Sequence, residues 1–363
     1  MKLAAGLLVL ISLCLTGCQE KFEPVAFDPP PSPALEGILA PNTELQKAEI
    51  LGADLFDGAE DVAPTADGWL YGGNEGGKIV RLPIGDAAGH KPEVFADTGG
   101  RPLGLDFDPE GNLVVADAAK GLLRVGPGGE VETLSTQAAG VPYRFTDDVD
   151  VGSDGMIFFS DASSKWGMHD YMLDALEGRP WGRLLRYDPS TKKTDVLLGD
   201  LYFANGIALS ANEDFVLVNE TYRFRIMRYW LKGPKAGTHD VFIEDLPGYP
   251  DGVSSDGKGT FWLALFTVRN PAADFLAPKP TLRELVAALP PSLWPKPEPY
   301  GFILGLSERG EILYSLQDPG GEHARQITSV EATDDALFLG TLHGKGVWRY
   351  PVPIGSFPRT GAQ

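Results

Sequence analysis

The stretch Phe203-Ala-Asn-Gly-Ile-Ala-Leu-Ser-Ala-Asn-Glu-Asp-Phe-Val-Leu-Val218 contains the pattern that decides the fold. A polar residue, Asn205, is followed two places on by the aliphatic Ile207 and eight places on by an acidic turn, after which a short apolar strand begins. Five other segments of the chain have the same spacing. The residues at the position of Asn205, here called the lead residues, are Glu60, Leu103, Asp147, Asn205, Asp251 and Thr328.

This repeat predicts an all-β protein. A period of roughly 40 to 50 residues, with a strand, a turn and a strand in each unit, is typical of radially repeated sheets. The six units therefore predict a six-bladed β-propeller, with loop or helix insertions in the two longer intervals. Because equivalent positions of the blades lie at equivalent radii, we expect the six lead residues to surround one point of the central channel.

The two insertions allow more than one interpretation. Residues 163–181 contain two tryptophans, two methionines and a histidine, and they form either a cover over one end of the channel or a small satellite core. Residues 268–300 contain the capping box Thr281-Leu-Arg-Glu284 before apolar residues at helical spacing. This helix is predicted to be a lid, to rest on a membrane, or to pack outside the fifth blade.

The N-terminal residues have the pattern of a bacterial lipoprotein. Lys2 precedes an apolar run that ends in Leu-Thr-Gly-Cys18, which resembles a lipobox, although an ordinary signal with a chance cysteine is the alternative. We expect a signal peptide at 1–17, a lipid-anchored proline-rich linker at 18–43, the propeller at 44–353 and a tail at 354–363. Leu45 to Leu51 is a candidate strand for closing the last blade. Lipidated Cys18 would anchor the protein to the cell envelope, in the outer membrane.

Composition excludes some classes of protein. The formal net charge of −19 argues against nucleic-acid binding, which favours basic surfaces. The only cysteines are Cys14 and Cys18, so no disulfide is predicted in the mature chain and stability must come from the apolar core. We expect a monomer.

Four of the six lead residues carry an oxygen suited to calcium. Glu60, Asp147 and Asp251 offer carboxylates and Asn205 offers an amide carbonyl, whereas no lead residue is a lysine or an arginine. Three carboxylates at close range repel one another unless a cation lies among them, so we predict a calcium site. The alternative is that these residues cap turns at the ends of the blades.

Several segments resemble the strictosidine synthase-like proteins. They are Gly182-Arg-Leu-Leu-Arg-Tyr-Asp-Pro189, Tyr202-Phe-Ala-Asn-Gly-Ile-Ala-Leu-Ser210, Glu220-Thr-Tyr-Arg-Phe-Arg-Ile-Met-Arg-Tyr-Trp-Leu-Lys-Gly-Pro234 and Leu246-Pro-Gly-Tyr-Pro-Asp251. The likeness covers roughly residues 40–350. It places the chain with the senescence marker protein/gluconolactonase and paraoxonase group of six-bladed propellers, many of which are calcium-dependent esterases or lactonases.

The resemblance also has implications for single residues. It implies metal ligation by Glu60, Asp147, Asn205 and Asp251. The histidine of paraoxonases is matched by Leu103, and the last-blade glutamate of true strictosidine synthase is matched by Thr328. A histidine-dyad base at that position is therefore absent, and amine–aldehyde condensation is disfavoured.

The resulting hypothesis is calcium-dependent hydrolysis of an ester or lactone. The cation would polarise the carbonyl, and Asp251 or Asp147 would activate water or attack directly. Asp148, Asp161 and His343 are further candidates near the site, although a lone histidine is more often structural. Two other classes remain open: a lipid-anchored propeller that binds a small molecule without chemistry, and an envelope interaction protein that uses calcium only structurally.

Overall fold

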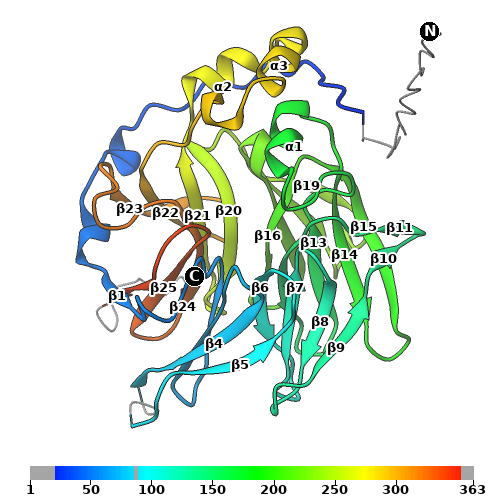
Figure 1. The fold of residues 1–363 in the computed structure, drawn as a ribbon, viewed down its shortest axis with the longest axis vertical. Helices are drawn as coiled ribbons and strands as arrows, with labels where there is room; N and C mark the ends of the chain where they lie inside the picture. Colours follow the sequence, from blue (N-terminus) through cyan, green and yellow to red (C-terminus); the bar gives the residue numbers. More distant parts are fainter. Residues whose placement is uncertain (1–20, 86–88, 353–363) are drawn as a thin grey trace, which may run out of the picture.

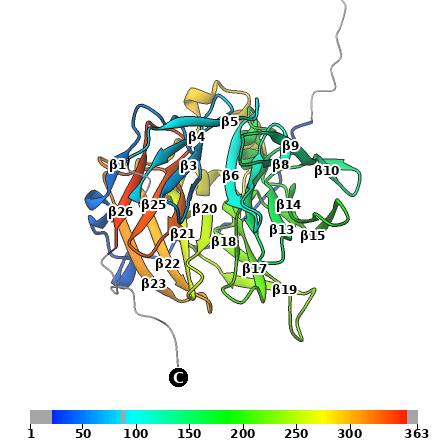
Figure 2. The same cartoon turned by 90° about the horizontal axis from the view of Figure 1, so that it is seen from below.

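The computed structural model describes residues 21–85 and 89–352, and in these residues the predicted six-bladed β-propeller is confirmed. Each blade is a four-stranded antiparallel sheet, and Figure 2 shows the sheets arranged around a centre. Strands of the first three blades are β2 (Val62–Pro64), β3 (Trp69–Gly73), β4 (Lys78–Pro83) and β5 (Glu93–Asp97); β6 (Pro102–Phe107), β7 (Leu113–Asp117), β8 (Gly121–Val125) and β9 (Val131–Ser135); β12 (Thr146–Val151), β13 (Ile157–Asp161), β14 (Gly182–Asp188) and β15 (Lys193–Leu201).

The other three blades follow the same order, with one difference in the last. Their strands are β16 (Ala204–Leu209), β17 (Phe215–Glu220), β18 (Arg225–Trp230) and β19 (His239–Ile243); β20 (Gly248–Ser255), β21 (Thr260–Val268), β22 (Gly301–Ser307) and β23 (Ile312–Asp318); β24 (Ile327–Ala332), β25 (Ala336–Thr341), β26 (Val347–Pro351) and β1 (Glu49–Leu51). Because β1 pairs with β26, the N-terminal part of the propeller completes the last blade. A closing strand is therefore present as predicted, but it covers only residues 49–51 of the predicted 45–51, because Glu44–Lys47 forms a 3₁₀ turn.

The first strand of each sheet forms the inner wall of the propeller. Strands β2, β6, β12, β16, β20 and β24 contact one another in that order, and β24 contacts β2, which closes the ring. The apolar core lies between neighbouring sheets. Between the fourth and fifth blades, for example, Phe215, Phe261 and Phe302 are buried in one cluster. Such burial is the main source of stability in the described part of the chain, which contains no cysteine.

Short helices lie at one end of the propeller, where Figure 1 shows them above the strands. They are α1 (Tyr171–Glu177) in the first insertion and α2 (Pro271–Leu276) and α3 (Pro280–Ala287) in the second. A β-hairpin outside the blades is formed by β10 (Gln137–Ala138) and β11 (Val141–Pro142), and the 3₁₀ turns are η1 (Gly37–Leu39), η2 (Glu44–Lys47), η4 (Thr221–Arg223) and η5 (Pro291–Leu293). In the part of the chain described here, no helix is both long and apolar enough to cross a membrane.

Residues 21–48 lie against the propeller, although the sequence predicts a spacer as far as residue 43. The amide of Val25 donates to the Glu177 carbonyl at 3.0 Å, and the amide of Phe27 donates to the Ala277 carbonyl at 3.1 Å. Further along, the side chain of Gln317 donates to the Leu39 carbonyl at 3.1 Å. This part of the proline-rich segment is held because its backbone groups pair with α1, the end of α2 and the fifth blade. The predicted signal peptide, Cys18 and the C-terminal tail lie outside the described residues.

Candidate functional site

Five of the six lead residues lie at the same irregularity of the inner strands, whereas Glu60 lies two residues before β2, which has no such shift. The register of pairing with the second strand shifts between Thr146 and Val149, and again between Ala204 and Ile207. The inner strands β6, β20 and β24 have the same shift around their own lead residues. A bulge of this kind bends the strand and redirects a side chain out of the regular ladder. It explains how a residue of a buried strand can face the channel end.

The residue after the lead residue packs against the next inner strand. A Cβ atom added to Gly206 would lie 2.5 Å from the Asp251 carbonyl oxygen, and one added to Gly252 would lie 2.5 Å from the Thr328 carbonyl oxygen. Real Cβ contacts are not that short. Glycine therefore allows neighbouring inner strands to approach each other.

All six lead residues line one cavity of about 500 Å³. The predicted convergence of these residues at one end of the channel is therefore found in the structure. Most other lining groups are apolar, and they include the aromatic side chains of Phe145, Tyr171, Phe203, Tyr222, Tyr249 and Phe266. A mostly apolar cavity with a few convergent polar groups is the usual form of a small-molecule site.

Both insertions form walls of this cavity. Tyr171 and Leu176 of α1 line it, and so do Leu276 of α2 and Arg283 of α3. The interpretation of both segments as covers agrees with this placement, and Phe27 of the N-terminal segment contributes to the same wall. The outer side of the second insertion is apolar and exposed, as the 62% exposure of Leu285 indicates. Contact of this helix with a membrane stays a prediction.

The three carboxylates of the cavity floor, Glu60, Asp147 and Asp251, are each at least 92% buried. Burial raises the pKa of Glu60 well above its usual value, and repulsion from Asp147 and Asp251 raises it further. The pKa of Asp147 is raised for the same reasons, burial first. Burial raises the pKa of Asp251 to about 7, and the neighbouring Asn205 amide offsets part of this effect. The floor is therefore a site at which negative charge is unfavourable without a cation.

The oxygen atoms of the floor residues are of the kind that calcium prefers, but the side chains are not arranged as a complete set of metal ligands. Three carboxylates and one amide are hard oxygen ligands, and the buried Oδ2 atom of Asp147 has no hydrogen-bond partner in the described part of the chain. No three His, Cys, Asp or Glu side chains among residues 21–85 and 89–352 are grouped closely enough to hold a metal ion as they stand. Calcium at this floor stays a prediction.

One cation near the floor was not expected from the sequence. Arg101 is 6% exposed, and its Nη2 atom donates to the Gly58 carbonyl at 2.7 Å. Its charge favours the ionised forms of both Glu60 and Asp147. Arg101 is not a lead residue, but it lies two residues before the lead residue Leu103. That basic residue next to a lead position was the available signal.

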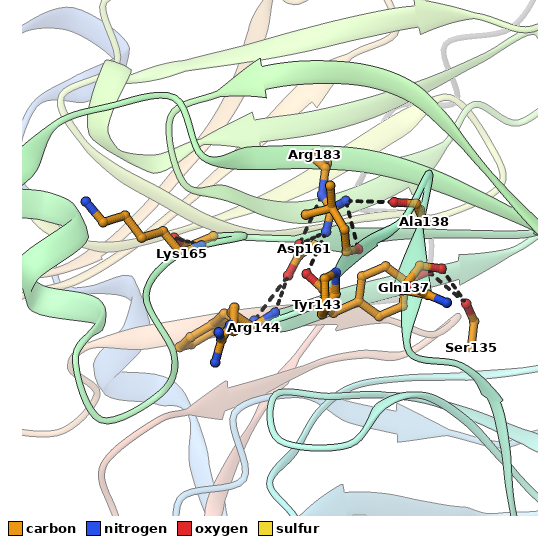
Figure 3. A network of polar contacts seen from close by, with 12 residues as sticks. Ser135, Gln137, Ala138, Tyr143, Arg144, Asp161, Lys165 and Arg183 are labelled. Carbon is orange, nitrogen blue, oxygen red and sulfur yellow. Dashed lines mark hydrogen bonds and ion pairs between the residues drawn. The ribbon is translucent and has the colours of Figure 1, made fainter. Parts of the chain in front are cut away.

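Asp161, one of the further candidates, is committed to an ion pair. Both Nε and Nη2 of Arg183 donate to its Oδ2 atom, at 3.1 and 2.5 Å, and its Oδ1 atom accepts from the amides of Arg144 and Phe145 (Figure 3). These bonds fix the chain just before Asp147. We therefore assign Asp161 a structural role, because its lone pairs are already used.

Of the other two candidates, His343 lines the cavity and Asp148 does not. Asp148 accepts the amide of Ile207 at 2.7 Å, so it links the third and fourth blades instead of lining the cavity. His343 does line the cavity, but its side chain is 53% exposed and its Nδ1 atom lies 3.8 Å from the carboxylate of Glu75. His343 thus belongs to the rim of the site.

Together, the fold and the site define a six-bladed β-propeller with a covered, carboxylate-floored cavity at one channel end. Comparisons with known proteins give its family. The profile of the strictosidine synthase family matches residues 147–234, and that of the strictosidine synthase-like N-terminal region matches residues 37–82. Adipocyte plasma membrane-associated protein of Rattus norvegicus is 35% identical over 366 residues, which covers 96% of this chain and 97% of the relative.

A plant relative extends the comparison. Strictosidine synthase-like protein 10 of Arabidopsis thaliana is 42% identical over 252 residues, covering 67% of each chain. The chain therefore belongs to the strictosidine synthase-like family. Among solved structures, a gluconolactonase from Xanthomonas campestris aligns with a TM-score of 0.60 at 18% identity, covering 91% of this chain and 97% of the other. Regucalcin from Agrobacterium tumefaciens, a calcium-binding protein, aligns with a TM-score of 0.57 at 16% identity, covering 83% and 93%. At these identities the likeness shows the fold alone.

Proposed function

We propose that this protein is a calcium-dependent hydrolase of esters or lactones. The observation that carries the proposal is the meeting of Glu60, Asp147, Asn205 and Asp251 on the floor of one cavity whose other walls are mostly apolar. The names of two propellers of the same fold, a gluconolactonase and a calcium-binding protein, support this choice over unrelated chemistry. Condensation of the strictosidine synthase type is disfavoured, because Thr328 offers no carboxylate and its hydroxyl donates to the Glu60 carbonyl at 2.6 Å.

In this proposal Glu60, Asp147, Asn205 and Asp251 hold the calcium ion. The bound ion would polarise the substrate carbonyl and stabilise the negative charge that develops on its oxygen. Asp251 accepts a proton from the attacking water, and Asp147 is the alternative group for this role or for direct attack.

Other residues of the cavity position the substrate. The rings of Phe203 and Tyr222, whose centroids are 5.0 Å apart, together with Phe145 exclude water from the apolar part of the substrate. His343 at the rim exchanges a proton with solvent or with the leaving group. Access to the floor is limited by α1, α2, α3 and Phe27.

The test is a panel of aryl esters and lactones, assayed with calcium and with a chelator. We expect turnover that chelation abolishes and calcium restores. Asp251→Asn keeps an oxygen ligand but removes the base, so it should lower kcat by roughly 10²- to 10⁴-fold with calcium still bound. Asn205→Ala removes one neutral ligand and should weaken calcium binding while the propeller stays folded. Asp195→Asn, on the exposed fourth strand of the third blade, is the matched control.

The outcome decides between the classes of protein. Calcium binding without turnover on any substrate of the panel would favour a binding propeller with structural calcium over a hydrolase. Turnover that is insensitive to chelation and to Asp251→Asn would contradict the proposed site.

We also propose that lipidated Cys18 attaches the protein to the envelope, on the outer membrane. The proposal rests on the lipobox-like Leu15-Thr-Gly-Cys18. We expect the propeller to act there as a monomer.

A further inference from the structure

A buried arginine faces the cavity without a charge partner. Arg283 of α3 lines the cavity and is only 4% exposed. Its Nε and Nη2 atoms are buried and have no hydrogen-bond partner within residues 21–85 and 89–352, and no carboxylate of these residues forms an ion pair with it. A buried guanidinium with unused donors is costly, because it has lost water without gaining protein partners.

A second arginine, Arg223, lines the same wall, and both guanidinium groups lie next to Gly178. A Cβ atom added to Gly178, the residue that ends α1, would lie 2.8 Å from Nη1 of Arg283. The carbonyl of Gly178 accepts a hydrogen bond from Nη2 of Arg223 at 3.2 Å. Both arginines therefore approach the end of α1. Their proximity is also seen in the pKa of Arg283, which burial, as the larger cause, and the charge of Arg223 together lower to about 10.

Arg223 is held in a fixed orientation. Its guanidinium lies over the Tyr202 ring, 3.4 Å from the centroid, and over the Phe27 ring, 3.8 Å from the centroid. Its Nη1 atom donates to the Tyr222 carbonyl at 2.9 Å. It also forms no ion pair with a carboxylate of the described residues. The stacking pre-orients the positive charge without neutralising it.

The acidic residue that α2 contributes to this wall is already paired. Asp274 of α2 accepts from Nη2 of Arg269 at 2.9 Å. The other acidic lining residues are the three carboxylates of the floor. The cavity thus has positive charge without an ion-pair partner at its helical wall and carboxyl groups at its floor, with aromatic and aliphatic side chains also lining it. A ligand that fits this pattern is apolar in the middle and anionic at one end.

We propose that Arg283 and Arg223 form a subsite for a carboxylate group on the ligand. The ligand class is an amphipathic acid, with an apolar chain or ring packed against the aromatic lining and its carboxylate at the arginines. If the proposed hydrolysis is correct, the reactive ester or lactone lies at the other end of this ligand, over the floor. That last point alone rests on the proposed function.

Carboxylate chemistry matches the geometry of the donors. A guanidinium offers parallel N–H groups that bind the two carboxylate oxygens together, and such charge-assisted bonds are stronger than neutral ones. An occupying carboxylate would also neutralise the repulsion between the two arginines. This accounts for a buried arginine that the fold itself does not use.

A binding experiment tests the subsite without any need for turnover. Octanoate and its neutral isostere octanamide are titrated into the full-length protein and followed by calorimetry. Hydrogen bonds to charged groups lead us to expect octanoate to bind roughly 10- to 100-fold more tightly than octanamide. In Arg283→Met, which keeps an unbranched apolar stem but removes the guanidinium, this preference should disappear while octanamide binding changes little. Arg309→Met, at an 82% exposed arginine, is the matched control and should keep the preference.

A thermal melt of the same variants separates a binding role from a structural one. Because the Arg283 guanidinium has unused buried donors, Arg283→Met should melt at the same temperature as the wild type or higher. If this variant does not fold, Arg283→Gln provides the same comparison. Equal affinity of the wild type for octanoate and octanamide, or a preference that survives loss of Arg283, would overturn the proposal.

A kinetic arm separates this inference from the proposed hydrolysis. Nitrophenyl hemiesters of dicarboxylic acids are compared with their methyl-capped, neutral counterparts. We expect a KM lower by roughly 10-fold or more for the anionic ester, with the difference lost in Arg283→Met. Octanoate selectivity without turnover would support the subsite and argue against the hydrolase. Turnover without any preference for the charged ester would support the hydrolase and argue against the carboxylate subsite.

Discussion

Asp174 of α1 provides a direct test of how burial acts beside the cavity. It is 1% exposed, and burial, as the largest cause, raises its pKa from 3.8 to about 8, although the Ser163 hydroxyl and the Lys165 ammonium offset part of the effect. At pH 7 the folded protein therefore keeps this carboxyl protonated. The unfolded chain ionises it with its ordinary pKa.

The sign of the pH effect follows from proton binding. Between pH 4 and pH 8 the folded state binds this proton and the unfolded state releases it, so stability falls as pH rises through this window. With 1.36 kcal/mol for each pH unit above the unfolded pKa, the loss is about 4 kcal/mol at pH 7 and about 2 kcal/mol at pH 5. Asp174→Asn is neutral in both states and should remove this loss.

The assay is calorimetric melting of wild type and Asp174→Asn at several pH values from 5 to 7. We expect the variant to be more stable at every pH, with an advantage that grows by about 3 kcal/mol from pH 5 to pH 7. Asp195→Asn, whose carboxylate is 58% exposed, is the control and should show no comparable growth. A variant whose advantage is constant with pH, or that is less stable at pH 7, would refute the reasoning that Asp174 is buried and protonated.

Three further predictions concern packing, an ion pair and localisation. Gly206→Ala would place a Cβ 2.5 Å from the Asp251 carbonyl oxygen, so it should destabilise the protein by about 1–3 kcal/mol in chemical denaturation and weaken calcium binding; unchanged values would contradict the close approach of these strands. Arg183→Gln leaves Asp161 buried without its charge partner and should cost about 3–5 kcal/mol, whereas a loss below 1 kcal/mol would show that the pair is dispensable. Cys18→Ser, with a cleavable signal, should move the protein from the detergent phase to the aqueous phase; continued partitioning with lipid would place the anchor elsewhere.

The number of blades and the position of the lead residues could be predicted from the sequence because both depend on local spacing. A strand, turn and strand recur at a fixed distance from Asn205 and its equivalents, and six such units can only close as a ring. The closing strand near Leu51 followed from the same logic. Calcium ligation at these residues remains a prediction that the described arrangement does not test.

Contacts between distant parts of the chain were decided only by the tertiary structure. No periodicity reports the bulge that turns Asp147 toward the cavity, because bulges arise from pairing between strands. Likewise, Arg101 lies near Glu60 only because neighbouring blades pack together. Arg183 forms its ion pair with Asp161 only when the strands of the third blade have paired.

The helical wall of the cavity shows most clearly what could not be predicted from the sequence. The sequence predicts that Thr281-Leu-Arg-Glu284 is a capping box in an amphipathic helix, and its arginine has no distinguishing feature. The capping box is wrong, because α3 already begins at Pro280 and its N-cap residue is Lys279, whose side chain makes no cap hydrogen bond. In the folded chain Arg283 is buried and faces the cavity beside Arg223, which lies 60 residues earlier in the chain. Burial and charge environment depend on which distant segments surround a side chain. The repeat therefore determined the scaffold, whereas three-dimensional packing decided the chemical character of the cavity.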